Sequence, residues 1–202
     1  MTRLIIWRHG QTEWNVENRM QGHTDVALDA VGHAQAAAAA TLLAAMRPDA
    51  IVASDLRRAA DTGAPLSAIT GLPAHLDPRM RERSFGQWQG MLVADVATAY
   101  PAEFARWQHG ETVAGCDVEE IDDFAKRVSE GVLDAVAMAD GGTVVVVTHG
   151  GSSKQALGGL LGWPQSVTAQ VIGLSNCHWT ELRHNAQRGW LLRAHNVGHT
   201  VD

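Results

Sequence analysis

Four consecutive valines, Val144 to Val147, constrain the fold more than any other stretch of this sequence. A β-strand that is apolar at every residue is buried on both faces, and such strands belong to parallel sheets that helices cover on each side. Two further short apolar runs, Leu4–Trp7 and Ala50–Ala53, have the same character. The chain therefore predicts an α/β fold with a mostly parallel central sheet.

Helical segments alternate with these strands. The alanine-rich residues 29–46 favour a long helix, and Asp29 is suited to cap its first turn. The remaining predicted helices span 55–70, 91–108 with a break at Pro101, 117–138 and 151–161. Further strands are predicted at 171–182 and 190–195, a turn at 140–142, and irregular structure at 74–90 and 109–116. Since no repeat or linker is visible, we expect one three-layer α/β/α domain over residues 1–202.

The charge balance excludes several classes of partner. The 202 residues include 16 Lys and Arg against 22 Asp and Glu, a formal net charge of -6, and the basic residues are scattered. This argues against binding nucleic acid or an anionic membrane surface, although a small anionic substrate needs only a local group of arginines. No run is long enough for a membrane span, and two cysteines cannot form a disulfide framework, so we expect a cytoplasmic protein.

Polar motifs follow three of the predicted strands directly. Arg8-His9-Gly10 follows the first strand, the sequence SDLRR follows Ala53, and His149-Gly150-Gly151 follows the valine strand. Ligands of parallel α/β sheets bind outside the carboxyl ends of the strands. We therefore expect these three motifs to meet in one site.

The motifs, in this order, resemble those of the histidine phosphatase superfamily, also called the phosphoglycerate mutase-like family. The resemblance covers most of the chain through LIIWRHGQTEWN, MQGHTDVALDAVGHAQA, SDLRRAADT, RERSFGQWQG and VVVVTHGG. It implies a nucleophilic His9 that becomes phosphorylated and a proton-donating Glu82. It also implies that the phosphoryl group is held by Arg8, Arg58 and His149. Arg58 is preferred to Arg57 because it stands immediately before the alanine of the motif.

The same resemblance indicates the rest of the phosphate pocket. Asn15 matches the family's phosphate-contacting asparagine, and the expected lining also includes Gly10, Gln21, Gly22 and Gly150. No metal or cofactor is implied, and the expected partner is a small phosphorylated substrate. Apolar residues near the C-terminal strands are compatible with a homodimer.

These residue types suit phosphoryl transfer, which depends on positioning and charge stabilisation. A neutral imidazole can attack phosphorus if its other ring nitrogen is held, and we expect a backbone carbonyl to hold it. Arg8 and Arg58 each offer a planar fork for two phosphate oxygens, and their charges favour the neutral form of His9. We expect Gly10 to remove side-chain bulk beside the attacked atom.

Hydrolysis of a small phosphomonoester, a phosphorylated sugar or phosphoglycerate-type compound, is the favoured reaction. A cofactor-dependent phosphoglycerate mutase is the main alternative, but mutases carry extra basic residues, whereas residues 107–123 contain no Lys or Arg. FGQWQG also resembles the phosphatase branch. A non-catalytic binding module would be expected to lack at least one key residue, and none is missing. A metal hydrolase is weakly suggested by HNVGH at residues 195–199, which contains a glycine and has no accompanying carboxylate motif.

One departure from the family concerns substrate selection. Many relatives carry a GGES-like turn before the long helix, whereas this chain has AGCD at 114–117. We expect Asp117 to cap the following helix and Cys116 to face the mouth of the pocket. A sugar-binding mouth could be lined by Trp14, Trp88, Trp107 and Trp163.

Overall fold

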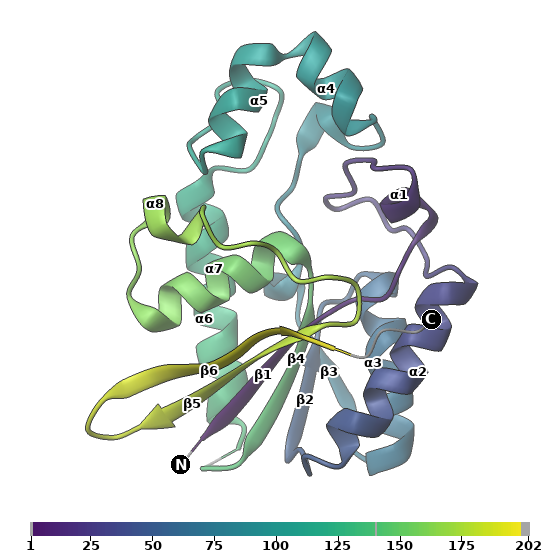
Figure 1. The fold of residues 1–202 in the computed structure, drawn as a ribbon, viewed down its shortest axis with the longest axis vertical. Helices are drawn as coiled ribbons and strands as arrows, with labels where there is room; N and C mark the ends of the chain where they lie inside the picture. Colours follow the sequence, from purple (N-terminus) through teal and green to yellow (C-terminus); the bar gives the residue numbers. More distant parts are fainter. Residues whose placement is uncertain (1, 140, 199–202) are drawn as a thin grey trace.

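A six-stranded sheet forms the centre of the computed structural model, which describes residues 2–139 and 141–198 (Figure 1). Its spatial order is β3-β2-β4-β1-β5-β6. The strands are β1 (Arg3–Arg8), β2 (Ala50–Ala53), β3 (Ala74–Leu76), β4 (Thr143–Thr148), β5 (Trp179–Asn185) and β6 (Gly189–Val197). The first four are parallel, and β5 and β6 add an antiparallel edge. The predicted mostly parallel α/β architecture is confirmed.

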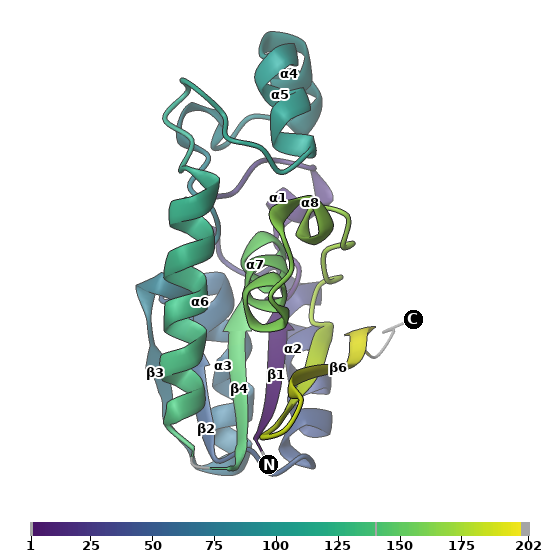
Figure 2. The same cartoon turned by 90° about the vertical axis from the view of Figure 1, so that its left-hand side faces the viewer.

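Helices cover both faces of the sheet (Figure 2). On one face lie α2 (Ala30–Ala44) and α3 (Arg57–Thr70), and on the other lie α6 (Ile121–Ala137) and α7 (Gly150–Leu161). Alternate residues of the central strands point to opposite layers, so Val144 and Val146 pack toward α6 and α7 while Val145 and Val147 pack toward α2 and α3. The valine strand β4 is therefore buried on both sides, as its composition predicts.

The helix caps follow the sequence signals on the α2–α3 side. Asp29 accepts a hydrogen bond from the backbone N–H of Gly32 at 2.7 Å, which caps α2 as predicted. Helix α3 contains Pro65 and ends at Gly71, whose φ of 74° is in the left-handed region.

A smaller lobe stands beyond the carboxyl ends of the parallel strands (Figure 1). It contains α4 (Val93–Ala99) and α5 (Pro101–Gln108), which meet at the predicted break before Pro101. Its own apolar cluster includes Met20, Phe85, Trp88 and Val96. The other short elements are α1 (Glu13–Val16), α8 (Gln165–Thr168) and the 3-10 turns η1 (Pro78–Met80) and η2 (Gly86–Trp88). The lobe places aromatic side chains above the strand ends.

Several sequence predictions need correction. Helix α6 begins at Ile121 with Glu120 at its N-cap, and Asp117 does not cap it because Gly115, Cys116 and Asp117 all have positive φ. Such a run of left-handed residues turns the chain away from a helix. The sequence predicts a strand over 171–182, but residues 171–178 are not part of a strand, since β5 starts at Trp179. The predicted irregular segment contains the short edge strand β3. Asp140, part of the predicted turn, lies outside the described residues.

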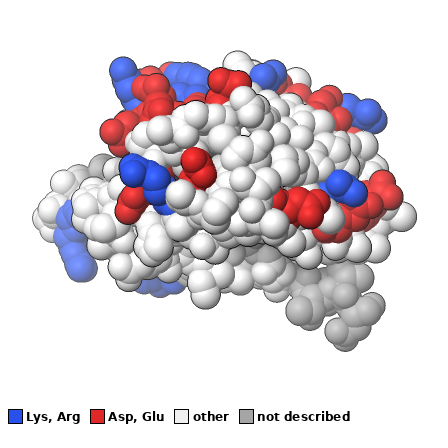
Figure 3. Space-filling view, turned by 90° about the horizontal axis from the view of Figure 1, so that it is seen from above, with Lys and Arg blue, Asp and Glu red and all other residues white. Residues whose placement is uncertain are grey.

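The charged residues do not form a continuous patch on the face seen in Figure 3, where basic and acidic groups are interspersed around an uncharged centre. Within residues 2–139 and 141–198, no helix is both long and apolar enough to cross a membrane.

Candidate active site

The three polar strand ends meet above the sheet, as the strand order requires. Strand β4 pairs with both β1 and β2, so Arg8 at the end of β1 lies beside Thr148, and Ala53 at the end of β2 lies beside Val147. The motifs that follow these residues therefore share one edge of the sheet. Together they line a cavity of about 180 Å³.

His9 is held as a neutral ring with one free nitrogen. It is 3% exposed, and its Nδ1 lies 2.7 Å from the carbonyl oxygen of Gly10, so Nδ1–H donates and Nε2 keeps its lone pair. Burial, and then the charges of Arg58 and Arg8, lower the pKa of His9 well below its ordinary value. The predicted backbone carbonyl partner is thus confirmed, and Nε2 has the state that a nucleophile requires.

Arg58 is fully buried in the wall of the cavity. Its Nη1 and Nη2 donate to the carbonyl oxygens of Thr24 and Gly22 at 2.8 and 2.7 Å, and its Nε donates to Nδ1 of His149 at 3.2 Å. Burial lowers the pKa of Arg58 to about 10, which leaves it charged at neutral pH. Each Nη atom retains one further N–H, so the fork is fixed in place and can still bind an anion.

His149 occupies both of its ring nitrogens with protein partners. Because Nδ1 accepts from Arg58, Nε2 carries the proton and donates to the hydroxyl of Ser54 at 2.9 Å. The ring centre lies 5.2 Å from that of His9, and burial lowers the pKa of His149 well below its ordinary value. In this geometry His149 orients Arg58, and a direct hydrogen bond to phosphate would require it to give up the bond to Ser54.

Arg8 and Asn15 are also fixed by neighbouring groups. Arg8 donates from Nη1 to the carbonyl oxygen of Leu174, and its buried Nε has no partner among the described residues. The Oδ1 of Asn15 accepts from the backbone N–H and hydroxyl of Thr12, both at 3.1 Å, and from Nδ2 of Asn176 at 3.2 Å. The amide NH₂ of Asn15 is consequently directed away from these partners and can donate to a ligand in the cavity that it lines.

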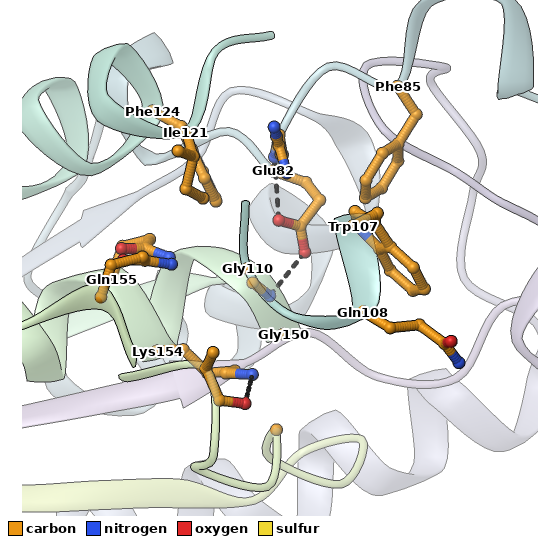
Figure 4. Close-up of a pocket in the computed structure, with 15 residues that line it drawn as sticks. Glu82, Phe85, Trp107, Gln108, Gly110, Ile121, Phe124, Gly150, Lys154 and Gln155 are labelled. Atoms are coloured by element: carbon orange, nitrogen blue, oxygen red, sulfur yellow. Dashed lines mark hydrogen bonds between the residues drawn. The ribbon is translucent and has the colours of Figure 1, made fainter. Parts of the chain in front are cut away.

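Glu82 lies on the wall between two cavities. Its Oε2 accepts from the backbone N–H of Gly151 at 2.7 Å and its Oε1 from that of Arg83 at 2.8 Å. The adjoining cavity, of about 510 Å³, shares Glu82, Phe85, Trp107 and Gly150 with the smaller one (Figure 4). A carboxyl group in this position faces both compartments.

The glycine after His9 lets β1 and α2 pack closely, in addition to leaving room beside the ring of His9. A Cβ on Gly10 would lie 2.5 Å from the carbonyl oxygen of Gly32, the third residue of α2, so the backbones of β1 and α2 approach too closely for a side chain. The N–H of Gly10 donates to Thr62 at 3.0 Å. The expected role, clearance beside the attacked atom, is therefore not the only reason for glycine here.

The smaller cavity brings most of the predicted residues together. Eight of the ten line it, namely Arg8, His9, Asn15, Gln21, Gly22, Arg58, Glu82 and Gly150. Gly10 and His149 lie behind that surface. Cys116 lines neither cavity and packs against the apolar cluster of the lobe, so its predicted place at the mouth is wrong. Of the four tryptophans, Trp107 lines both cavities and Trp88 is fully buried in the lobe.

Several positioning residues were not predicted from the sequence. Ser54 holds His149, Thr62 holds the N–H of Gly10, and Asn176 bridges Asn15 and the carbonyl oxygen of His9. They act through backbone groups or through other side chains. Ser54 is the first residue of the SDLRR motif, which was the available signal; Asn176 lies in a segment wrongly predicted as a strand.

Among residues 2–139 and 141–198, no group of three or more His, Cys, Asp or Glu side chains is placed to hold a metal ion. His199, the last residue of the HNVGH stretch, lies outside the described part of the chain.

Comparisons with known proteins find relatives over most of this chain. The glucosyl-3-phosphoglycerate phosphatase of Mycobacterium tuberculosis is 39% identical over 188 residues, which cover 89% of this chain and 84% of the relative. The segments HGQTEWNVENRMQG and NCHWTEL of this chain resemble those of actinobacterial proteins of that name, and the identity over most of the chain agrees with this likeness. The metal-independent phosphoserine phosphatase of Arabidopsis thaliana is 34% identical, over 75% of this chain and 65% of the relative.

A solved structure and a family model extend the match to nearly the whole chain. The mycobacterial glucosyl-3-phosphoglycerate phosphatase in complex with VO3 superposes with a TM-score of 0.89 at 37% identity, covering 97% of this chain and 99% of that one. Residues 4–197 match the model described as histidine phosphatase superfamily (branch 1). The chain belongs to branch 1 of the histidine phosphatase superfamily.

Proposed function

We propose that this protein is a metal-independent phosphatase that hydrolyses small phosphomonoesters through a phosphohistidine on His9. The observation that carries the proposal is the state of His9, a buried neutral ring with Nδ1–H bound to the Gly10 carbonyl and flanked by two arginines. The names of the relatives, which are phosphatases, support the same reaction class.

In the first step, Nε2 of His9 attacks the phosphorus atom in line with the leaving oxygen. The bond from phosphorus to the substrate oxygen breaks as the bond from phosphorus to nitrogen forms, and Glu82 gives its proton to the leaving alcohol. Arg8, Arg58 and the amide of Asn15 hold the phosphoryl oxygens, whose charge the two guanidinium groups balance. His149 holds the guanidinium group of Arg58 in position by accepting a hydrogen bond from its Nε.

In the second step, water attacks the phosphohistidine from the position that the alcohol has left. Glu82, now a carboxylate, takes a proton from that water, and the phosphorus–nitrogen bond breaks to release phosphate and neutral His9. Each cycle consumes one water and restores both side chains. Because Glu82 faces the larger cavity, it can serve the alcohol in one step and the water in the next.

The test is a comparison of wild-type protein with His9→Ala in buffer containing EDTA. We expect wild-type protein to release phosphate from p-nitrophenyl phosphate with the chelator present, and to acquire an acid-labile label from substrate phosphate. His9→Ala should lose both properties. Full inhibition by EDTA that a divalent metal restores, or a near-wild-type rate for His9→Ala, would contradict the mechanism.

The mutase alternative is tested in the same assay. A mutase would transfer the phosphoryl group between phosphoglycerates and would depend on 2,3-bisphosphoglycerate, whereas the proposed phosphatase should release inorganic phosphate without it. Turnover of 3-phosphoglycerate to its isomer faster than phosphate release would favour the mutase.

A further inference from the structure

One tight turn holds the guanidinium group of Arg58 in place. The backbone N–H of Thr24 donates to the carbonyl oxygen three residues earlier at 3.0 Å, so residues 21–24 form a β-turn. The carbonyl oxygens of Gly22 and Thr24 accept hydrogen bonds from Nη2 and Nη1 of Arg58 at 2.7 and 2.8 Å. These two carbonyl groups flank His23, whose side chain takes no part in the phosphoryl transfer proposed above.

The imidazole of His23 reaches from this turn to the segment that carries the proposed proton donor. Its Nε2 lies 2.8 Å from the backbone carbonyl oxygen of Glu82, and because a carbonyl group can only accept, Nε2–H is the donor. The ring is half-buried, and burial is the main cause that lowers the pKa of His23 below its ordinary value, so the ring is neutral at pH 7. The backbone on either side of His23 thus holds Arg58, while its side chain holds Glu82.

The turn that carries His23 is also bound to Gln89, which directly follows η2. The backbone N–H of His23 donates to the side-chain oxygen of Gln89 at 2.7 Å. The preceding residue, Gly22, has a φ of 53°, in the left-handed region, and a Cβ there would overlap with the same oxygen of Gln89. Since the turn is bound both to Gln89 and to Arg58, the ring of His23 has little freedom to move away from Glu82.

The carbonyl group of Glu82 has two donors, which come from different parts of the chain. Nη2 of Arg127 donates to it from α6 at 2.7 Å, and Nε2 of His23 donates to it from the turn at 2.8 Å. Arg127 also binds two earlier carbonyl oxygens of the same segment, so it fixes that segment relative to α6. His23 instead fixes Glu82 relative to the turn that holds Arg58.

We infer that His23 is a positioning residue that sets the distance between the proton donor Glu82 and the phosphoryl group held by Arg58. This inference rests on the proposed function and names a residue on which its proton-transfer step depends. A general acid is effective only within hydrogen-bond reach of the leaving oxygen, whose position is set by the groups that hold the phosphoryl group. A shift of the Glu82 segment relative to the turn therefore slows proton transfer and leaves phosphate binding intact.

The test compares two amide substitutions that differ by one methylene group. Glutamine places an N–H at nearly the reach of Nε2 of histidine, whereas asparagine carries the same amide but is too short for the carbonyl oxygen of Glu82. With an alkyl phosphate, His23→Asn should lower kcat/KM by about three- to tenfold, as loss of one hydrogen bond provides, and His23→Gln should retain most of the wild-type value. With p-nitrophenyl phosphate, whose leaving group needs no proton, both variants should stay within about twofold of wild-type protein.

Phosphate binding and a distant histidine provide the controls. The affinity for inorganic phosphate should change by less than about twofold in both variants, because the carbonyl groups that hold Arg58 belong to the backbone and remain. His33→Asn, which changes an exposed ring on α2, should leave the rates with both substrates unchanged. No loss in His23→Asn, a loss that is equal with both substrates, or a loss that His23→Gln shares in full would overturn the inference.

Hydrogen exchange distinguishes failure of this inference from failure of the phosphatase mechanism. The N–H of Gly151 belongs to the first turn of α7 and has no partner within the helix, so its bond to Oε2 of Glu82 protects it. In His23→Asn protein this N–H should exchange about three- to tenfold faster than in wild-type protein, while that of Ser153, which binds the carbonyl oxygen of His149, should not change. If wild-type protein failed to hydrolyse even p-nitrophenyl phosphate, the mechanism would fall while the exchange rates still decided the role of His23. Unchanged exchange at Gly151 would overturn that role alone.

Discussion

Gly151 has no room for a side chain because the carboxylate of Glu82 occupies that space. A Cβ at this position would come within 2.3 Å of Oε1, whereas at Gly150 the nearest atoms would lie at 3.8 Å. The backbone N–H of Gly151 also binds the other oxygen of Glu82. The absence of a side chain at this residue therefore fixes where the proposed proton donor lies.

Gly151→Ala should consequently reduce proton donation without unfolding the protein. Alanine favours a helix over glycine by about 1 kcal/mol. This gain offsets part of the free energy that the clash with Glu82 costs, so the protein should remain folded. We expect kcat/KM, which reports the steps up to formation of the phosphohistidine, to fall at least about tenfold with an alkyl phosphate, and much less with p-nitrophenyl phosphate, whose leaving group needs no proton. Steady-state rates with the two substrates check this expectation.

The control for this prediction is Glu82→Gln. If Gly151→Ala acts through Glu82, then the double variant should be no slower than Glu82→Gln alone, because residues that act together are not additive. An equal loss of kcat/KM with both substrates would show instead that Gly151 matters for another reason.

The residues proposed to act on the phosphate were predictable from the sequence, and the residues that hold them in place were not. His9, Arg8 and Arg58 stand in motifs whose chemistry is evident and whose strand-end positions follow from the fold class. Ser54 and Asn176 act only through His149, Asn15 and a backbone carbonyl. A serine or asparagine in a loop has many ordinary roles, so its partner must be known before its function is evident.

At the scale of elements, the segment that carries Glu82 has no regular structure after η1 and is held from α6. Arg127 donates from Nη1 to the carbonyl oxygens of Arg79 and Arg81, at 2.9 and 2.8 Å, and from Nη2 to that of Glu82 at 2.7 Å. Its other two N–H groups bind the carboxylate of Glu119 at 2.6 and 2.8 Å. Every N–H of this guanidinium group is used, and α6 thereby fixes the position of the proposed proton donor.

Arg127→Lys should loosen that segment. Lysine keeps the charge but has three N–H groups for five acceptors, so at least two carbonyl or carboxylate oxygens lose their partner. We expect the free energy of unfolding to fall by about 1–3 kcal/mol, measured by urea denaturation, and kcat to fall with it. Binding of inorganic phosphate should change little, because Arg8 and Arg58 do not contact Arg127.

The matched control is Lys126→Gln, which changes an exposed basic residue one position earlier on α6. It should alter the free energy of unfolding by less than about 0.5 kcal/mol and leave kcat unchanged. Wild-type stability and kcat in Arg127→Lys protein would rule out the positioning role.

Elements with strong apolar patterns were predicted well, and elements fixed by distant contacts were not. Strand β2 matches its predicted bounds at Ala50–Ala53, because four apolar residues between polar segments leave little freedom in register. Residues 171–178 contain apolar residues typical of a strand, but they form a loop at the site. In this loop the carbonyl oxygen of Leu174 accepts a hydrogen bond from Arg8, and the side chain of Asn176 donates one to Asn15. Those contacts join positions 166 and 161 residues apart and leave no local pattern.

At the scale of the whole molecule, the site joins segments that are far apart in the sequence. Unfolding of the protein therefore exposes the two buried histidines of the site together. His9 follows β1, His149 follows β4, and Arg58 contacts His149 across 91 positions of sequence. Burial first, and then the charge of Arg58, lowers the pKa of both histidines, so the folded protein holds them neutral. The unfolded chain instead protonates them below the ordinary histidine pKa of about 6.5.

Stability should therefore fall as pH is lowered through that value. Because the folded-state pKa values are depressed, these two histidines bind up to two more protons in the unfolded chain than in the folded one below pH 6.5, and protonation favours unfolding. Burial also lowers the pKa of His23, which adds to the same dependence. Between pH 7 and pH 5.5 we expect the free energy of unfolding to drop by about 2–3 kcal/mol, measured by urea denaturation without phosphate. The hydrogen bond from Arg81 lowers the pKa of Asp55, so the stabilising contribution of that carboxylate is lost only at more acidic pH.

Substitution of single histidines assigns this pH dependence. His9→Gln removes one of the two buried rings, so the drop in the free energy of unfolding between pH 7 and pH 5.5 should be about half that of wild-type protein. His33→Gln changes an exposed ring on α2 and should keep the wild-type dependence. A drop that His9→Gln leaves unchanged would mean that His9 takes up its proton alike in the folded and unfolded protein, which would contradict the depressed pKa of the buried ring.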